Sequence, residues 1–431
     1  MLLLVRRTLV FMLVLAAVAL VACEEATPTP RPTRPKPTDT PIPTVAPTET
    51  RAPVTPTPIP LPTNTIVPVT VVQPTAVPKS LVNSPYLPNF GPFPPKAIPS
   101  RPSNINPLTG LTADPAKLQR RPILARIGND QIVRDSFWQA GTSSADIVFE
   151  ELIDILGSSY ANTRYTAVFL SNDPPLIGPI RSGRIINFQQ APMMDGALVH
   201  AGASDGTRWL FSQSPMINLD EYFNQPAYCY NQSHGYQGRL YTTGPRLREW
   251  LAQKKWEQPI QLYGFNFSDN KPNGTAITSV GLTKNPWPAW NATTWQYNAA
   301  NGKYMRTATG TPQMDASTTV TAKWGNGADC ILSGTETKTQ VSASNVVVLF
   351  ATHEKTTIVE DSNNAVSVHI NLVGQGDAQF FRDGVMVKGK WQRASEQEFF
   401  NLMDSTGASF SLKPGTTWFE IVPIGYTVDV K

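Results

Sequence analysis

The residues best suited to chemistry are three arginines near a serine and a glycine. Arg181 and Arg184 flank Ser182-Gly183, and Arg164 opens the strand predicted before them. The planar guanidinium group suits two-pronged binding of phosphate or carboxylate. If Ser182 begins a helix, its hydroxyl and the free backbone N–H groups add donors for an anion. The sequence therefore predicts an anion-binding pocket for a phosphate, a polymer carboxylate or a lipid headgroup.

Nearby acidic residues offer the same arginines a structural role instead. Side chains alternate along the strand predicted over residues 146–150, so Asp146 and Glu150 share one face. In a binding or catalytic site, these carboxylates would face the arginines, and Asp146 or Glu150 would serve as a base. In the structural alternative, they and Glu151 pair with the arginines and tie neighbouring strands together. The sequence leaves both alternatives open.

His200 is predicted at the end of a short strand before Gly202, a position where α/β proteins often place binding sites. Ser204 and Asp205 follow, but no Gly-x-Ser-x-Gly nucleophile elbow is present, which disfavours a Ser-His-Asp triad. The four histidines have no i, i+4 partners and no two cysteines have zinc-site spacing. We therefore predict neither a metal site nor a cofactor.

The N-terminal residues 1–23 are typical of an export signal. Arg6 and Arg7 precede an apolar run of about 14 residues, shorter than the roughly 20 that a membrane-spanning helix needs. The run ends in Leu-Val-Ala before Cys23, which resembles a bacterial lipoprotein signal whose cysteine is lipidated and becomes the first residue. Two or three acyl chains hold a protein firmly on a bilayer. Lipidation of Cys23 would place the chain on the outer face of the cell membrane.

Residues 24–103 are dominated by proline and threonine and hold 23 of the 40 prolines. Proline fixes φ and removes a backbone donor, so neither helix nor sheet runs through such a stretch. The composition predicts a disordered, extended stalk at about 3.1 Å per residue, which would hold the folded part away from the membrane. The alternative is a disordered tail with no length requirement.

Charge and cysteine content narrow the remaining possibilities. The net charge is +4 without a dense basic block, which disfavours nucleic acid as the partner. Three cysteines are too few for a disulfide-built scaffold. Once Cys23 is set aside, Cys229 and Cys330 form either a disulfide or two separate buried thiols.

The folded part is predicted as a mixed α/β (α+β) fold of layered sheets and helices, divided into residues 104–260 and 261–431. The second half is richer in hairpins, because Asn301-Gly302 and Asp383-Gly384 are turn sequences between short apolar runs. The predicted strands cover residues 146–150, 165–170, 197–200 and 418–422, and the predicted helices cover 245–255 and a segment that begins at 395 and runs towards 407.

Several short motifs recur in a fixed order and resemble those of the YerB-like family of bacterial lipoproteins. They are Asn106–Leu111, Ala145–Glu150, Ile177–Arg184, Leu198–Gly202, Gly374–Gly376, Phe380–Gly384, Gly389–Trp391 and Pro414–Trp418. The resemblance covers nearly all of residues 105–425 and implies a two-part α/β fold without a settled activity. The family usually has Asp where Gly128 stands and often has His where Gln313 stands, so a metal or catalytic role at those positions is in doubt.

We therefore predict a lipid-anchored extracytoplasmic protein that binds an envelope component through its folded part. Its partners would be the membrane, reached through the lipid, and an anionic envelope polymer or an envelope protein. The alternative is an envelope enzyme acting on phosphate-linked or glycan substrates.

Overall fold

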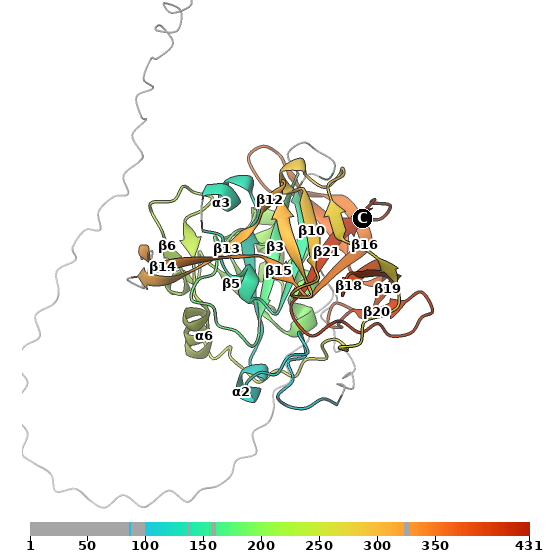
Figure 1. The fold of residues 1–431 in the computed structure, drawn as a ribbon. Coiled ribbons are helices and arrows are strands. Elements are labelled where there is room, and N and C mark those ends of the chain that lie inside the picture. Colours follow the sequence, from blue (N-terminus) through green and yellow to red (C-terminus); the bar gives the residue numbers. More distant parts are fainter. Residues whose placement is uncertain (1–85, 88–99, 137, 155, 157–160, 323–327) are drawn as a thin grey trace, which may run out of the picture. The chain divides into compact units, whose positions relative to one another are not determined.

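Strands account for most of the regular structure of this chain, and its helices are few and short (Figure 1). The computed structural model describes residues 86–87, 100–136, 138–154, 156, 161–322 and 328–431. Cys23 and almost all of the proline-rich stretch lie outside these residues.

A twelve-stranded sheet forms the centre of the fold. Its strands are β1 (Ile123–Gly128), β2 (Ile147–Asp154), β3 (Asn162–Phe169), β4 (Ala197–His200), β5 (Ile217–Asp220), β8 (Thr275–Ala276), β16 (Asn345–Val359), β17 (Val366–Asn371), β18 (Gly374–Arg382), β19 (Val385–Arg393), β20 (Asn401–Asp404) and β21 (Thr417–Pro423).

The central sheet joins a parallel part to an antiparallel meander. At one end β1, β4 and β5 run parallel, and β3 and then β2 add to β1 in antiparallel order. At the other end β16, β18, β19 and β20 follow one another in antiparallel order. β21 connects the two parts, because it pairs in parallel with β2 on one side and with β16 on the other.

A six-stranded sheet and two short ribbons complete the strands. The second sheet holds β9 (Ser279–Leu282), β10 (Thr293–Asn298), β11 (Lys303–Ala308), β12 (Thr311–Pro312), β15 (Ser342–Ala343) and β22 (Asp429–Val430). The ribbons are β6 (Cys229–Tyr230) with β7 (Leu240–Tyr241), and β13 (Met314–Ala322) with β14 (Cys330–Gln340).

The helices are short segments between strands. The α-helices are α2 (Pro115–Leu118), α3 (Gln131–Ser136), α4 (Asn187–Gln190), α5 (Asp205–Ser212) and α6 (Gly244–Gln253). Single 3₁₀ turns are η2 (Thr142–Ser144), η3 (Pro192–Met194), η4 (Gln225–Ala227) and η5 (Ala289–Asn291). Thr243 caps the start of α6 by accepting a hydrogen bond from the Arg246 amide, and Ser204 caps α5 in the same way.

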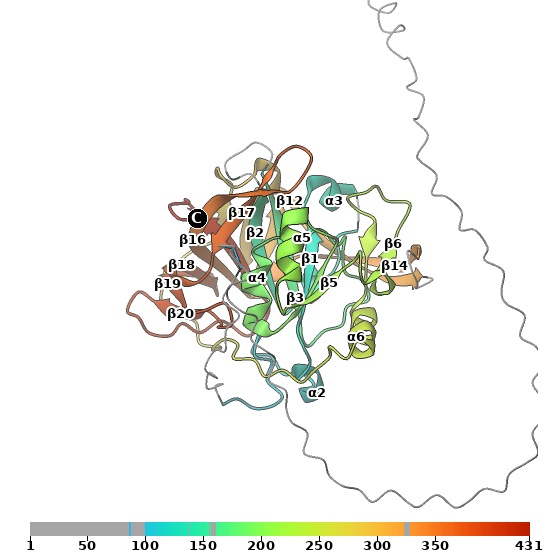
Figure 2. The same ribbon diagram turned by 180° about the vertical axis from the view of Figure 1, so that it is seen from behind.

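Each face of the central sheet has its own apolar core. Helices α4 and α5 cover one face, which we call the helix face (Figure 2). In its core, Phe149 and Phe419 belong to one apolar cluster with Phe188 and Phe211. On the opposite face, which the second sheet covers and which we call the second-sheet face, Trp418 packs with Trp295, 5.1 Å between ring centroids. Neighbouring residues of one strand serve different cores because side chains alternate across a strand.

Both predicted hairpins form, and Asp383 and Gly384 take the positive φ angles of a tight turn between β18 and β19. The predicted helix beginning at residue 395 is wrong, because Trp391 pairs with Leu402 and draws residues 401–404 into the sheet as β20. The mixed α+β prediction holds coarsely, with helices a minor component. Both predicted halves of the folded part contribute strands to the central sheet, and the division at residue 260 stays a prediction.

None of the helices that the structure describes has the length and apolar character needed to cross a bilayer.

Candidate functional site

The strand β2 sends its two central carboxylates to opposite faces of the sheet. Glu150 points to the second-sheet face and Glu151 to the helix face, and both are fully buried. A buried carboxylate needs a partner of opposite charge or several hydrogen bonds. Each of the two glutamates forms an ion pair with a different arginine.

On the helix face, Glu151 forms an ion pair with Arg126 of β1. Gln190 of α4 donates a hydrogen bond to the second carboxylate oxygen, 3.2 Å away, and Thr166 of β3 donates one to Gln190 at 3.0 Å. Burial raises the pKa of Glu151 and lowers that of Arg126, while their mutual attraction opposes both shifts. This network ties α4 to three strands.

The predicted arginines meet at the loop of residues 181–183. Arg164 of β3 donates to the Ser182 carbonyl oxygen at 3.1 Å, and Arg184 donates to the neighbouring Gly183 carbonyl oxygen at 3.0 Å. Residues 181–186 are irregular, and α4 begins at Asn187. The expectation that Ser182 begins a helix is therefore wrong, and the helix-end donors of an anion site are missing at this serine.

Two of the three arginines face carboxylates, but these are not the Asp146, Glu150 and Glu151 that the structural alternative names. Arg184 lies 2.9 Å from Asp154 and 3.5 Å from Glu360, and Arg181 lies 3.5 Å from Asp130. A bulge in β2 between Leu152 and Asp154 brings Asp154 within reach of Arg184, since a bulge re-aims the side chains that follow it.

Arg164 differs, because it has no carboxylate within ion-pair distance among the described residues. Its side chain is 3% exposed. Burial lowers its pKa well below the usual value, and the positive charges of Arg184 and Arg181 lower it further. Among the predicted anion-binding arginines, Arg164 therefore receives the least charge neutralisation from the described carboxylates.

Gly128, where the family usually has Asp, sits directly beneath Arg181. A Cβ atom at residue 128 would lie 2.9 Å from the Arg181 Cγ, so glycine leaves the space that the arginine stem occupies. Gly128 pairs with Arg164 across β1 and β3, so this cross-strand position offers Arg164 no side-chain carboxylate.

His200 lies beneath the same loop but is already engaged. Its Nδ1 is 2.8 Å from the Gly202 carbonyl oxygen, and its Nε2 contacts the side-chain amide of Asn218. Burial lowers the pKa of His200 and keeps the ring neutral at neutral pH. Because both ring nitrogens are occupied, and Ser204 caps α5, the structure does not assemble a Ser-His-Asp triad from these residues.

On the second-sheet face, Glu150 forms an ion pair with Arg306 of β11 and accepts hydrogen bonds from Asn129 at 2.9 Å and Thr163 at 2.7 Å. The Arg306 guanidinium carbon lies 5.2 Å from the Trp418 ring centroid and 5.5 Å from that of Trp295. A guanidinium over aromatic faces gains cation–π attraction in a dry environment.

A second carboxylate shares this cluster. Glu420 of β21 pairs in register with Glu150 and accepts a hydrogen bond from the Trp295 indole at 2.8 Å. Burial raises the pKa of Glu420 well above its usual value, and the neighbouring Glu150 charge raises it further. One arginine therefore serves two buried carboxylates, and this shortage of positive charge favours the protonated form of Glu420.

Gln313, where the family often has His, lies in the same cluster. Its amide donates to Gln139 at 2.6 Å and to the Tyr165 hydroxyl at 3.1 Å. It is 3% exposed, so here it completes a buried hydrogen-bond network.

Asp146 lies at the start of β2, away from the arginines. Its carboxylate accepts hydrogen bonds from the Leu170 amide at 2.6 Å, the Ser171 hydroxyl at 2.6 Å and the Asn106 amide at 2.6 Å. Burial raises its pKa, and these donors oppose that rise. Asp146 thus fastens the chain that enters the fold to the end of β3.

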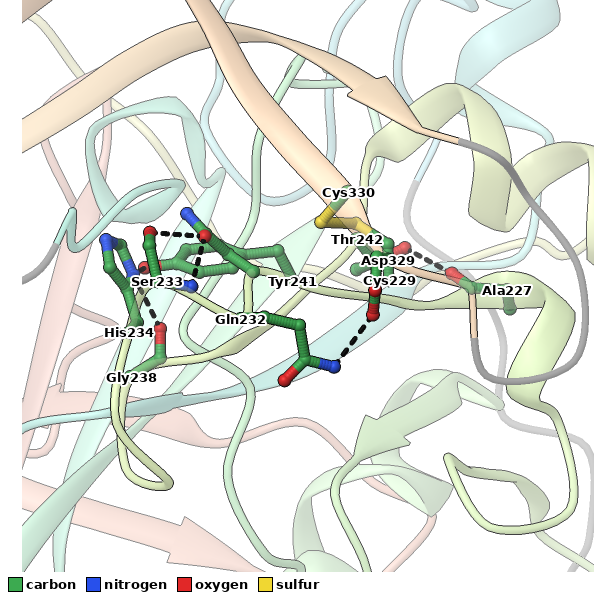
Figure 3. The surroundings of a disulfide bond; sticks show 11 residues. Ala227, Cys229, Gln232, Ser233, His234, Gly238, Tyr241, Thr242, Asp329 and Cys330 are labelled. Atoms are coloured by element: carbon green, nitrogen blue, oxygen red, sulfur yellow. Dashed lines mark hydrogen bonds between the residues drawn. A yellow bond between two sulfur atoms is a disulfide. The ribbon is translucent and has the colours of Figure 1, made fainter.

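The structure joins Cys229 of β6 and Cys330 of β14 in a disulfide, with their Cα atoms 5.3 Å apart (Figure 3). The two cysteines are 101 residues apart in the sequence. The bond fastens the β13–β14 ribbon to the β6–β7 ribbon. Within the described part of the chain, no three His, Cys, Asp or Glu residues are placed to hold a metal ion.

Two family models match the chain. Residues 108–257 match the model described as "Protein of unknown function (DUF3048) N-terminal domain", and residues 284–419 match the corresponding C-terminal domain. The chain belongs to this YerB-like family.

Two comparisons with individual proteins agree. The Bacillus subtilis protein YerB, whose name classes it as a lipoprotein, is 25% identical over 333 residues, which cover 76% of this chain and 89% of YerB. The crystal structure of YerB from Bacillus subtilis superposes with a TM-score of 0.58 at 21% identity, over 75% of this chain and 98% of that one. This second likeness establishes a shared fold.

Within this YerB-like chain, sequence reasoning missed Arg306 and Glu420. A signal for Glu420 exists, because it is the single charge inside the apolar strand Trp418–Val422. A signal for Arg306 is weaker: it alternates with Tyr304 and Ala308 on the buried side of its hairpin.

Proposed function

We propose that this chain is a lipid-anchored extracytoplasmic protein whose folded part binds a component of the cell envelope. Three observations support the anchor: the charged and apolar start, the small residue before Cys23, and the lipoprotein name of YerB. The proline-rich residues 24–103 would act as the spacer between bilayer and folded part. In this proposal the protein acts by binding and not by catalysis.

We favour binding over catalysis because the candidate acids lie away from the candidate arginines. A phosphate- or glycan-cleaving site would need Glu150 or Asp146 beside Arg181 and Arg184 as acid/base groups. Instead, Glu150 faces Arg306 on the opposite side of the sheet, and Asp146 is held by four donors just before β2 begins. These two acids hold parts of the fold together. The enzyme alternative therefore lacks an acid/base group beside Arg181 and Arg184.

The loop at Ser182 remains our candidate contact for an anionic group of an envelope polymer or protein. Arg181 is 17% exposed in its side chain, and Arg164 behind it lacks a carboxylate among the described residues. An anion that reached Arg164 would receive a charge-assisted hydrogen bond, which is stronger than a neutral one.

The proposal is tested by replacing the lipidated residue. We expect the wild-type chain to incorporate labelled palmitate and to stay in the membrane pellet after a carbonate wash, and Cys23→Ala to lose both properties. External protease should remove the folded part of the wild type from intact, wall-stripped cells. Tyr236→Ala, a change of an exposed residue that leaves Cys23 and the disulfide in place, is the control and should remain in the pellet. A Cys23→Ala chain that still pellets, or a wild type found in the cytosol with residues 1–23 intact, would refute the proposal.

A further inference from the structure

A groove lined with aromatic rings lies outside the charged clusters. It runs between α5, the loop after β5 and the segment that follows α6, and its volume is about 640 Å³. Its aromatic lining consists of Trp209, Phe211, Phe223 and Trp256. We call these residues and the space between them the aromatic groove.

Two of these rings are unusually exposed for their size. Trp209 is 51% exposed and Phe223 is 67% exposed, and Tyr222, beside Phe223, is 63% exposed. Tyr222 meets Phe223 edge to face at 5.0 Å, and the Arg208 guanidinium lies 5.5 Å from the Tyr222 ring centroid. Aromatic side chains gathered in one exposed place mark a binding surface more often than chance exposure does.

The cations of the aromatic groove are already occupied. Arg208 forms an ion pair with Asp220 at 2.9 Å, and the Lys254 ammonium lies 4.6 Å from the Trp250 ring centroid. The exposed carboxylate of Asp205 adds a negative charge to the same lining. This balance of charges gives the groove little attraction for a polyanion and suits a neutral ligand better.

Polar side chains share the lining with the rings. Ser212 and Asn218 contribute a hydroxyl and an amide. Asn224, in contrast, is buried, and its amide bonds to the Asp220 carbonyl oxygen and the Trp250 indole. The Asn218 Oδ1 contacts His200, which leaves the Asn218 NH₂ group as the donor for a ligand. A sugar ring needs this combination, because its C–H face stacks on an aromatic ring while its hydroxyl edge exchanges hydrogen bonds. The groove volume lies within the roughly 300–1,000 Å³ of ordinary ligand sites and has room for two or three sugar rings.

We propose that the aromatic groove binds a neutral polysaccharide chain, with Trp209 and Phe223 stacking on successive sugar rings and Asn218 bonding to a hydroxyl or acetamido group. The inference rests on the proposed function, because it names the chemistry of the envelope component that the folded part binds. It places this contact at α5, next to the Ser182 loop, since a Cβ atom at Gly183 would lie 2.7 Å from the Phe211 ring.

Calorimetric titration of the full chain in detergent tests the inference. The probes are the tetramers of β-1,4-linked N-acetylglucosamine and of β-1,4-linked glucose. We expect saturable binding of at least one tetramer, insensitive to salt because the ligand is neutral. Trp209→Ala and Phe223→Ala should each weaken it about tenfold, which corresponds to about 1.4 kcal/mol. Tyr236→Ala is the matched control, since Tyr236 is 78% exposed and lies outside the groove.

Three results would overturn the inference: no saturable binding of either tetramer, binding that Trp209→Ala and Phe223→Ala leave unchanged, or equal loss in the Tyr236→Ala control. A peptide of residues 53–62 is the rival probe, because aromatic grooves also bind polyproline helices. If the groove takes this peptide and neither sugar, the inference is refuted. Failure of sugar binding in a chain that still pellets with membranes leaves the proposed function standing, whereas a cytosolic wild type refutes that function itself.

Discussion

Breaking the disulfide between Cys229 and Cys330 should lower the stability of the whole fold. The bond closes a loop of 101 residues. The chain-entropy model assigns about 4.7 kcal/mol at 25 °C to a loop of this length, and measured values run from about 2 to 5 kcal/mol. With an unfolding entropy of about 2.1 cal/mol/K per residue, the roughly 330 residues of the folded part would lose about 7 °C in Tm for the full effect.

Urea unfolding followed by tryptophan fluorescence measures this change. The comparison is oxidised against reduced wild type, because reduction removes the cross-link and keeps both sulfur atoms in place. The double variant Cys229→Ser/Cys330→Ser, measured with and without reductant, controls for effects of the reductant itself. We expect reduction to lower the unfolding midpoint of the wild type and to leave that of the double variant unchanged.

The reasoning fails if reduction changes the free energy of unfolding by less than about 1 kcal/mol. Hydrogen exchange would then show where the bond acts. Faster exchange confined to the β13–β14 ribbon would mean that the disulfide fastens one ribbon locally and does not constrain the unfolded chain as a whole.

Two further predictions concern buried ionisable groups. Arg306→Met should cost about 3–5 kcal/mol in urea unfolding because it leaves Glu150 buried without its cation, and Arg306→Met/Glu150→Gln should recover part of that loss; a double variant no more stable than the single one would contradict the pairing. Burial lowers the pKa of His353 to about 4, so between pH 6.5 and 4 the unfolded chain binds a proton that the folded chain does not. The stability advantage of the wild type over His353→Gln should be complete above about pH 6.5 and shrink as the pH falls towards 4, and a constant difference across this range would exclude the effect.

Local signals in the sequence predicted the elements whose cause is local. Asp383-Gly384 is a turn sequence, and the hairpin β18–β19 forms around it. The α6 helix follows from Pro245 in its first turn and from Leu247 and Leu251 on one face. The helix predicted after Ser395 does not form. The edge of β19 offers hydrogen-bond partners to residues 401–404, and this strand pairing prevails over the local capping signal.

The partners of the charged residues could not be read from the sequence, because they come from distant segments. Arg184 meets Glu360, Glu150 meets Arg306, and Glu420 is placed beside Glu150 by strand pairing. The sequence grouped Arg164 with Arg181, Ser182 and Arg184. The structure places all four at the loop of residues 181–183. The sequence could not show which face of the sheet Glu150 occupies. Side chains alternate along β2 whether Glu150 or Glu151 faces the arginines.

The position of β21 sets the order in which this fold can be completed. Thr416, the residue before β21, donates a hydrogen bond from its hydroxyl to the Ala145 carbonyl oxygen near β2. The two residues are 271 positions apart in the sequence. Until residues 417–423 have been synthesised, β2 and β16 each lack their parallel neighbour, and β17 alone bridges them, through a single residue pair with β2. The central sheet is therefore complete only when β21, the last of its strands in sequence order, is in place.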